Sequence, residues 1–301
     1  MLLLTGATGL VGSALLRRLV DPDGPAQPVR CLVREPRGLG PDRVRVQIAL
    51  GDLADPPSFR NALRGVSTVV HLAATIRDQP QGSIEELNGI ATWRLVQAAE
   101  RAGVQRFVFF SALNASSHDR TRFLRAKALA EQAVVRSAIP QHTIFAPSIV
   151  YAPGDRFLTM LERMALLPLM PVSGRGRATY QPIWAEDVAD CVVAALARAE
   201  STHARYELAG PETLTHTDIV RLAAAAAGRH RPLVHVPTPI VSRGLRAVGA
   251  LMKSKAPAVW DEAELMEVPL TTRRGTADAE SLGVHPRAMA EVLGVAAPAA
   301  A

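Results

Sequence analysis

Short apolar runs alternate with longer amphipathic stretches over the first 150 residues. The run from Phe107 to Phe110 is apolar at every position, as expected of a strand that helices cover on both faces of a parallel sheet. This alternation is typical of repeated strand–helix–strand units. We therefore predict six parallel strands: Leu2 to Thr5, Val29 to Val33, Val44 to Ile48, Thr68 to Leu72, Arg106 to Phe110 and His142 to Phe145.

The amphipathic stretches of this half carry helical periodicity. From Leu10 to Val20, apolar residues recur at Val11, Leu15 and Leu19, which places them on one face of a helix lying on a sheet. Residues Glu85 to Ala102 show the same pattern. The sequence therefore predicts an α/β fold, with a doubly wound parallel sheet in residues 1–150.

Beyond Pro147 the pattern loosens into segments separated by prolines. We expect residues 151–301 to form a smaller α+β lobe interleaved with the sheet core. Its expected elements are Phe157 to Leu167, Ala185 to Ala197, Arg205 to Leu208 and Thr215 to Ala227. Residues Pro237 to Lys255 predict an amphipathic helix that packs on the lobe or lies on a membrane surface. We expect the Ala-Pro tail after Val295 to be disordered.

Composition and charge narrow the function classes. The 301 residues are 48% hydrophobic and carry 34 basic and 28 acidic side chains, a net charge of +6. The basic residues are scattered, so we do not expect nucleic-acid binding. Cys31 and Cys191 have neither Cys-x-x-Cys spacing nor a neighbouring histidine cluster, which argues against a metal site or disulfide framework and for a reducing, cytoplasmic compartment. Without an apolar run of about 18 residues we expect no transmembrane segment, while peripheral membrane or protein-complex association stays open.

A glycine-rich turn follows the first predicted strand and opens the first predicted helix. Gly6 permits the tight turn, Gly9 lets backbone N–H groups approach a pyrophosphate, and Gly12 allows close packing of the helix on the sheet. The N-terminus of the helix favours an anion there, because its N–H groups are unpaired and its dipole is positive. The predicted dinucleotide phosphate site comprises Gly6, Thr8, Gly9, Leu10, Val11 and Gly12.

Several further segments occur in the order found in one superfamily. They are Gly51 to Asp55, Val70 to Ala74, Asn88 to Gly103, Ala146 to Gly154 and Gln181 to Ala189. With the Gly-x-x-Gly-x-x-Gly turn, they make the first 230 residues or so resemble the short-chain dehydrogenase/reductase superfamily. The resemblance is to its extended and atypical branches, including NmrA-like proteins, and it implies a Rossmann fold that binds a nicotinamide dinucleotide.

The residue after the second strand bears on the choice of cofactor. NAD-binding units place an acidic residue there to accept hydrogen bonds from the adenosine ribose. This sequence has Arg34, whose planar guanidinium offers donors to a 2′-phosphate, and Arg37 lies close behind. We therefore expect NADP(H) to be favoured over NAD(H). The alternative is that Arg34 forms a salt bridge with Glu35 or another carboxylate.

The resemblance implies further cofactor contacts. Asp52 and Leu53 are expected at the adenine, and Ala73 and Ala74 at its ribose and phosphates. The complete set implied beyond the glycine turn and Arg34 is Asp52, Leu53, Leu72, Ala73, Ala74, Ser111, Lys127, Pro147 and Ser148.

The residues expected to carry catalysis are incomplete. By resemblance, active members carry Tyr-x-x-x-Lys on a long helix, with the tyrosine as acid and base, the lysine on the nicotinamide ribose and a serine after the fifth strand. Here Ser111 and Lys127 are in place, but Phe123 stands where the tyrosine is expected. A phenyl ring cannot transfer a proton, and losing a positioned acid or base costs about 10² to 10⁴ in rate.

Three outcomes are open for this site. In the first, Lys127, Tyr151 or water supplies the proton, as in an oxidoreductase or a sugar-nucleotide epimerase or dehydratase. In the second, the hydride goes to an acceptor that needs no protein proton, such as a quinone or flavin. In the third, the protein binds NADP(H) without turnover, as a sensor or assembly factor. The segment from Ser111 to Glu131 resembles the NAD(P)H-binding accessory subunit of respiratory complex I, which favours the third outcome.

Most remaining polar residues have structural explanations, while His118 and Asp119 could form a polar gate or plain surface. We expect His71 to be packed in its strand, and His118 and Asp119 to lie in a loop near the site. Glu186 and Asp187 open a predicted helix, where acidic groups favour the dipole. Thr215 with Asp218 marks another helix start, and no residue set predicts a metal.

Overall fold

In this computed structural model, residues 1–24, 27–198, 204–237 and 264–296 are described. The core is a seven-stranded sheet in the order β11-β6-β5-β4-β1-β2-β3. Its strands are β1 (Leu2–Thr5), β2 (Val29–Val33), β3 (Gln47–Leu50), β4 (Thr68–His71), β5 (Arg106–Phe110), β6 (Gln141–Pro147) and β11 (Ala204–Leu208). All neighbouring pairs are parallel. The order is that of a Rossmann fold with one further strand, which confirms the predicted fold class.

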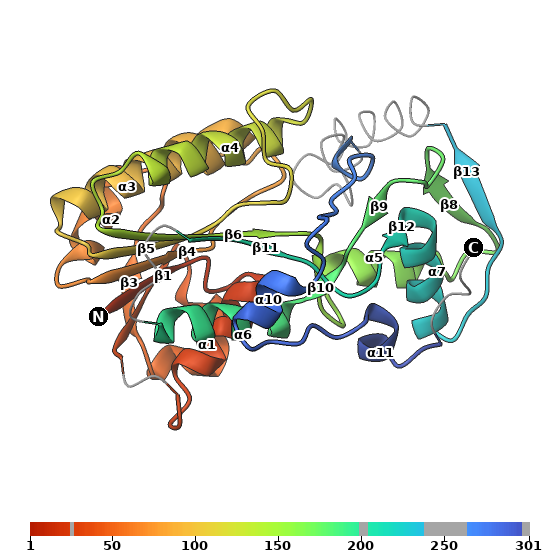
Figure 1. Ribbon diagram of the computed structural model, residues 1–301, viewed down its shortest axis with the longest axis horizontal. Helices are drawn as coiled ribbons and strands as arrows, with labels where there is room; N and C mark the ends of the chain where they lie inside the picture. The colour runs from red at the N-terminus through yellow and green to blue at the C-terminus, as the bar shows by residue number, and fades with distance from the viewer. Residues whose placement is uncertain (25–26, 199–203, 238–263, 297–301) are drawn as a thin grey trace.

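Helices cover both faces of this sheet (Figure 1). One face holds α1 (Leu10–Leu19), α6 (Ala185–Ala197) and α10 (Ala277–Ser281) over a continuous apolar cluster. The other face packs an apolar cluster against α2 (Pro56–Phe59), the 3-10 helix Arg60–Leu63, α3 (Ala91–Arg101) and α4 (Arg122–Val135). The strands β1, β4 and β5 are buried throughout or nearly so, as their unbroken apolar runs predict.

Two segments that the sequence assigned to the smaller lobe are part of the sheet domain. Helix α6 packs along α1. Strand β11 pairs with β6 in parallel, with Ala204 opposite Thr143 and Leu208 opposite Pro147. The chain leaves the sheet after β6 and returns to it, so position along the sequence did not reveal this placement.

The third strand is shifted from its prediction. It spans Gln47–Leu50, whereas Val44 to Ile48 was expected. A 3-10 helix, Pro36–Val44, occupies the start of the predicted run, and Gly40 inside it has φ +58°. The apolar Val44 therefore ends a helical turn and is 81% exposed.

The smaller lobe has its own apolar core at the right of Figure 1. Its elements are β7 (Val150–Tyr151), α5 (Arg156–Met164), β8 (Met170–Ser173), β9 (Thr179–Tyr180), β10 (Ile183–Trp184), β12 (Leu214–Thr215), α7 (His216–Ala226), β13 (Leu233–Val236) and α11 (Met289–Leu293). Helix α7 begins with a complete capping box, in which Thr215 and Asp218 bond each other's backbone N–H, as predicted. The amphipathic helix expected over Pro237 to Lys255 lies, apart from Pro237, outside the described residues, as does the tail after residue 296.

Candidate functional site

A cleft of 1060 Å³ opens at the carboxyl ends of β1, β2 and β4. Strand order reverses between β1 and β4, and open parallel sheets bind their ligands at such a crevice. Of the predicted cofactor residues, nine line it: Gly6, Thr8, Gly9, Arg34, Asp52, Leu53, Leu72, Ala73 and Ala74. The structure thus brings together residues from four separate segments of the sequence.

The turn from β1 to α1 requires two of its glycines. Gly6 has φ +76°, and a Cβ there would lie 2.5 Å from Ala73 N. A Cβ on Gly12 would lie 2.0 Å from Gly6 O, so this helix position packs directly on the turn. Helix α1 then begins at Leu10 with no side-chain cap and no acidic residue in its first turn. Its first N–H groups, those of Leu10 to Gly12, have no partner within the helix and can bind an anion.

Arg34 stands at the edge of this cleft, directly after β2. Its side chain is exposed, and it forms no ion pair or hydrogen bond with any residue in the described part of the chain. The neighbouring Glu35 also lines the cleft but does not pair with it. The Arg34 guanidinium lies near the glycine turn and has no carboxylate partner among the described residues, so it is available to an anionic ligand.

Asp52 lies opposite, where β3 ends. One carboxylate oxygen accepts a hydrogen bond of 2.9 Å from Ala54 N, and the Asp52 N–H donates to Ser58 Oγ at 2.8 Å. The loop is therefore fixed by local bonds, and the second oxygen of Asp52 is left for a ligand.

Sequence reasoning missed one wall of the cleft, the loop that follows Ala74 in the chain. Its lining residues are Thr75, Gln79, Pro80, Gln81 and Leu87. Asn88, in the π-helix Glu86–Ile90, holds this loop by donating to Thr75 O at 2.7 Å and accepting from Thr75 N at 3.0 Å. The signal was available, because polar residues directly following a strand's carboxyl end lie at the ligand-binding edge of a parallel sheet.

Arg122 holds the same loop from the first turn of α4. Its guanidinium bonds Asp78 at 3.0 Å and Glu85 at 2.7 Å. Hydrogen bonds from Arg122 lower the pKa of both carboxyls. The loop therefore stays attached to α4 at neutral pH.

His71 lies beneath the cleft and is packed, as expected. Its Nδ1 is 2.6 Å from the hydroxyl of Thr5, and its Nε2 is 2.9 Å from that of Thr92. Burial lowers its pKa to about 3. The ring is therefore neutral and links the strand floor to α3.

The predicted catalytic group lies apart from the cleft lining. Lys127 is buried and donates to Phe110 O at 2.6 Å, with the rings of Phe109 and Phe123 at 5.0 and 5.7 Å from Nζ. Burial lowers the pKa of Lys127 to about 7. The ammonium is thus held by a backbone carbonyl and sits beside the phenyl ring that replaces the expected hydroxyl.

The two candidate hydroxyls are also buried. Ser111 Oγ and the Tyr151 hydroxyl have no hydrogen-bond partner among the described residues. Burial raises the pKa of Tyr151, and the carboxylate of Asp187 adds to this. Neither side chain is placed to exchange a proton with solvent.

Pro147 and Ser148 do not line the cleft either. Ser148 Oγ donates to Leu270 O at 2.6 Å and accepts from Gln181 N at 3.1 Å, which ties the segment after β6 to the returning chain. Their expected cofactor contact remains a prediction.

The other acidic candidates have structural partners. Asp119 caps its own loop by accepting from Thr121 N at 2.7 Å. Glu186 pairs with Arg17 and Arg18 of α1, and Asp187 with Arg287 at 3.2 Å. Glu186 and Asp187 lie in the first turn of α6, as predicted.

Comparison with known proteins fits this architecture. The model of the NmrA-like family matches residues 1–259. The chain belongs to the NmrA-like family. This NmrA-like protein is 30% identical over 261 residues to NADH dehydrogenase (ubiquinone) 1 alpha subcomplex subunit 9, mitochondrial, of Arabidopsis thaliana, with 84% of this chain and 64% of that protein covered.

A second relative carries a different name. The chain is 31% identical over 235 residues to (4-alkanoyl-5-oxo-2,5-dihydrofuran-3-yl)methyl phosphate reductase of Streptomyces griseus, with 76% of this chain and 74% of that protein covered. The structure of the present chain superposes on that of the NADPH-dependent quinone oxidoreductase QOR2 of Escherichia coli complexed with NADPH. The TM-score is 0.75 at 18% identity, and the superposition covers 98% of this chain and 99% of that one. The NmrA-like chain spans about half to two thirds of several curated relatives.

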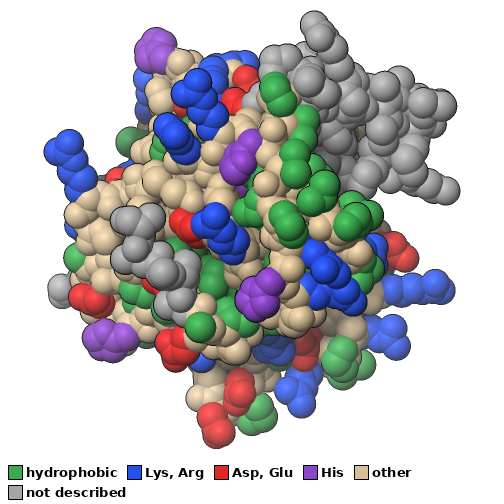
Figure 2. Space-filling view, turned by 90° about the vertical axis from the view of Figure 1, so that its right-hand side faces the viewer, with side chains coloured by type: hydrophobic (Ala, Val, Ile, Leu, Met, Phe, Trp, Pro, Cys, Tyr) green, Lys and Arg blue, Asp and Glu red, His purple; other side chains and the backbone are tan. Residues whose placement is uncertain are grey.

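The surface of the NmrA-like protein gives two more observations. Lysine and arginine side chains are spread in small groups over the face of the lobe, among hydrophobic ones (Figure 2). Within the described ranges, no helix is both long and apolar enough to cross a bilayer. Because relatives are named mitochondrial and chloroplastic, the cytoplasmic location remains a prediction.

Proposed function

We propose that this protein binds NADP(H) in the cleft at the carboxyl ends of β1, β2 and β4. The observation that carries the proposal is the unpaired guanidinium of Arg34 at the rim of the glycine turn. The turn would hold the pyrophosphate through the first N–H groups of α1, and Arg34 would hold the 2′-phosphate. When bound, the dinucleotide supplies or accepts a hydride.

The residues present fit such a ligand. The close approach of Gly6 and Gly12 leaves the backbone open where a Cβ would obstruct it. Asp52 and Leu53 border the same cleft, where the adenine is expected. Glu35, directly after Arg34, is an acid that could instead favour a ribose hydroxyl, which makes NAD(H) the competing ligand.

Calorimetry with both cofactors tests the proposal. NADPH should bind more tightly than NADH, and Arg34→Ala should weaken NADPH binding by about 10- to 100-fold, because a hydrogen bond to a charged group contributes about 1.5–3 kcal/mol. NADH binding should change little, and Arg34→Asp should reverse the preference. Arg101→Ala, at the exposed end of α3, is the control. Equal affinity for the two cofactors, or tighter NADH binding, would contradict the preference.

We further propose that the bound cofactor is not used by a tyrosine-dependent route. Phe123 lacks the hydroxyl, Lys127 donates to a backbone carbonyl, and Ser111 is buried. This favours binding without turnover, as a sensor or assembly factor, and the relationship to a complex I subunit supports that role.

Turnover is the second candidate, favoured by the relationship to a named reductase. An acceptor that needs no protein proton, such as a quinone, fits the residues best. NADPH oxidation should be measured against quinones, ketones, nucleotide sugars and phosphorylated lactones, with Lys127→Ala as a comparison. Saturable binding with no oxidation supports the non-catalytic role, whereas turnover that the variant loses supports the enzyme.

A further inference from the structure

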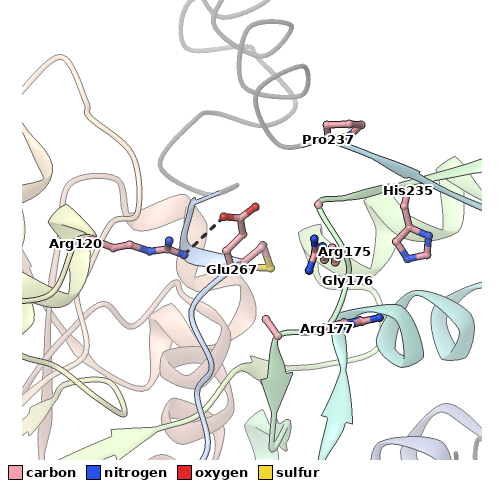
Figure 3. A pocket seen from close by; sticks show the side chains of 10 residues that line it. Arg120, Arg175, Gly176, Arg177, His235, Pro237 and Glu267 are labelled. Atoms are coloured by element: carbon pink, nitrogen blue, oxygen red, sulfur yellow. Dashed lines mark ion pairs between the residues drawn. The ribbon is translucent and has the colours of Figure 1, made fainter.

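A second cavity lies between the sheet domain and the lobe. It has a volume of 620 Å³ and shares no lining residue with the dinucleotide cleft. Figure 3 shows Arg120 and Glu267 on one side of it and the loop after β8 on the other. That loop contributes Gly174, Arg175, Gly176 and Arg177.

The lining of this cavity is strongly basic. Its described lining holds three arginines, Arg120, Arg175 and Arg177, and one carboxylate, that of Glu267. Arg175 and Arg177 have no carboxylate partner in the described part of the chain. Arg120 and Glu267 are 3.7 Å apart, at the outer limit of an ion pair. Among the described lining residues, positive charge therefore exceeds negative charge, which suits the oxygens of a phosphate group.

The loop that presents two of these arginines is held firmly on α7. Thr217 donates to Gly176 O from both its N–H and its hydroxyl, each at 3.2 Å. Gly176 has φ +62°, and a Cβ there would lie 2.2 Å from the Thr217 hydroxyl. His216 N also bonds Ala178 O at 2.9 Å. Arg175 and Arg177 are therefore attached to a fixed backbone, which lowers the entropy cost of binding an anion between them.

We propose that this cavity binds the phosphoryl group of a small phosphate monoester. Arginine forks suit phosphate oxygens, and the neighbouring Met266, Pro237 and Ala178 offer an apolar surface to the organic part of the ligand. The site is separate from NADP(H) binding and does not depend on it. Arg120, which lines this cavity, is two residues from Arg122, which holds the loop at the cofactor cleft.

The proposal is tested by calorimetry with inorganic phosphate and with phenyl phosphate, using the full chain with and without saturating NADPH. Arg175→Ala and Arg177→Ala should each weaken phenyl phosphate binding by about tenfold or more, because each removes a charge-assisted bond. Arg163→Ala, an exposed arginine of α5, is the matched control and should bind as the wild type does. Melting temperatures of all variants confirm that they fold.

Glu267→Gln provides a readout that a purely structural role would not move. Removing the negative charge frees Arg120 and reduces repulsion, so phenyl phosphate should bind at least about threefold more tightly. Phenyl phosphate should also bind more tightly than inorganic phosphate, since the apolar lining contacts the ring. Tighter inorganic phosphate, or weaker binding by Glu267→Gln, would overturn the assignment.

Arg34→Ala separates this site from the dinucleotide cleft. If phosphate binding survives that variant but is lost in Arg175→Ala, the cavity is the site, whatever the cofactor result. If Arg34→Ala abolishes phosphate binding and the lobe variants leave it intact, the proposal is wrong, and the anion is bound at the glycine turn instead.

Discussion

Lys127 shows how burial controls the charge of a single side chain. Its ammonium lies among apolar rings with one backbone carbonyl as partner, and burial lowers its pKa to about 7 from an unperturbed 10.5. The unfolded chain therefore binds more protons than the folded protein between these two pH values. Stability must rise with pH across that window.

Replacing Lys127 by methionine should remove this pH dependence. Between pH 7 and pH 10 the wild type should gain about 3 kcal/mol of unfolding free energy relative to Lys127→Met, because each pKa unit corresponds to about 1.4 kcal/mol. Urea unfolding at pH 7, 8.5 and 10 measures the difference. Parallel pH profiles for the two proteins would show that burial does not lower the pKa of Lys127, which would contradict the prediction.

The candidate site could be predicted at the residue scale only where a motif fixed the backbone. The glycine turn, Arg34 and Asp52 lie at strand ends, and the topology brings strand ends together at one edge. Ser111 and Tyr151 were selected by type and position, but their burial depends on packing against distant segments. Thr75 follows a strand's carboxyl end, which is a general signal for the ligand-binding edge, but its hydrogen bonds with the buried Asn88 are seen only in the structure.

Among the elements, the turn from β1 to α1 combines a left-handed residue with a close backbone contact. Gly6 has both features, whereas Gly65 has φ +70° but open space around its Cβ position. A substitution at Gly65 therefore tests backbone strain alone, whereas one at Gly6 tests backbone strain together with a steric clash.

Alanine at these two glycines should have unequal effects. Gly65→Ala should lower the unfolding free energy by about 1 kcal/mol through left-handed strain alone. Gly6→Ala should cost about 3 kcal/mol or more, since its Cβ would also meet the backbone of Ala73. Chemical denaturation gives both values, and similar losses at the two sites would contradict the steric explanation.

Most elements could be predicted because their periodicity is local. Helix α6 spans Ala185–Ala197 as expected, and β1, β2 and β5 have their predicted bounds. Strand β3 was misplaced because Val44 looks like a strand residue, while Pro41 and Gly40 produce a helical turn before it. Apolar type alone does not distinguish the two.

At the scale of the whole molecule, residues 264–296 connect the lobe to the sheet. Asp278 in α10 is 3% exposed, accepts from Glu207 N of β11 at 2.7 Å and pairs with Arg274 at 2.5 Å. Farther on, Met289 N donates to Glu212 at 2.7 Å in the lobe. These contacts join segments far apart in the chain, so local sequence patterns do not encode the placement of α6 and β11 in the sheet domain.

Removing the Asp278 carboxylate should destabilise the sheet edge. Asp278→Ala leaves a half-buried N–H of Glu207 without this partner and removes the ion pair with Arg274, so we expect a loss of about 1–3 kcal/mol. Glu280→Ala, on the exposed side of the same helix, should stay within about 0.5 kcal/mol. Hydrogen exchange of the β11 amides reports the effect locally, and unchanged protection in Asp278→Ala would contradict it.

The bond between β11 and α10 also has a consequence for synthesis on the ribosome. Its two partners are 71 residues apart in the chain. At a synthesis rate of about 5–20 residues per second, α10 is completed roughly 4 to 14 seconds after the edge strand β11 that it covers. During that interval a nascent chain exposes an unprotected strand to its neighbours on the same polysome, so chaperone capture at this stage would raise the yield of native protein.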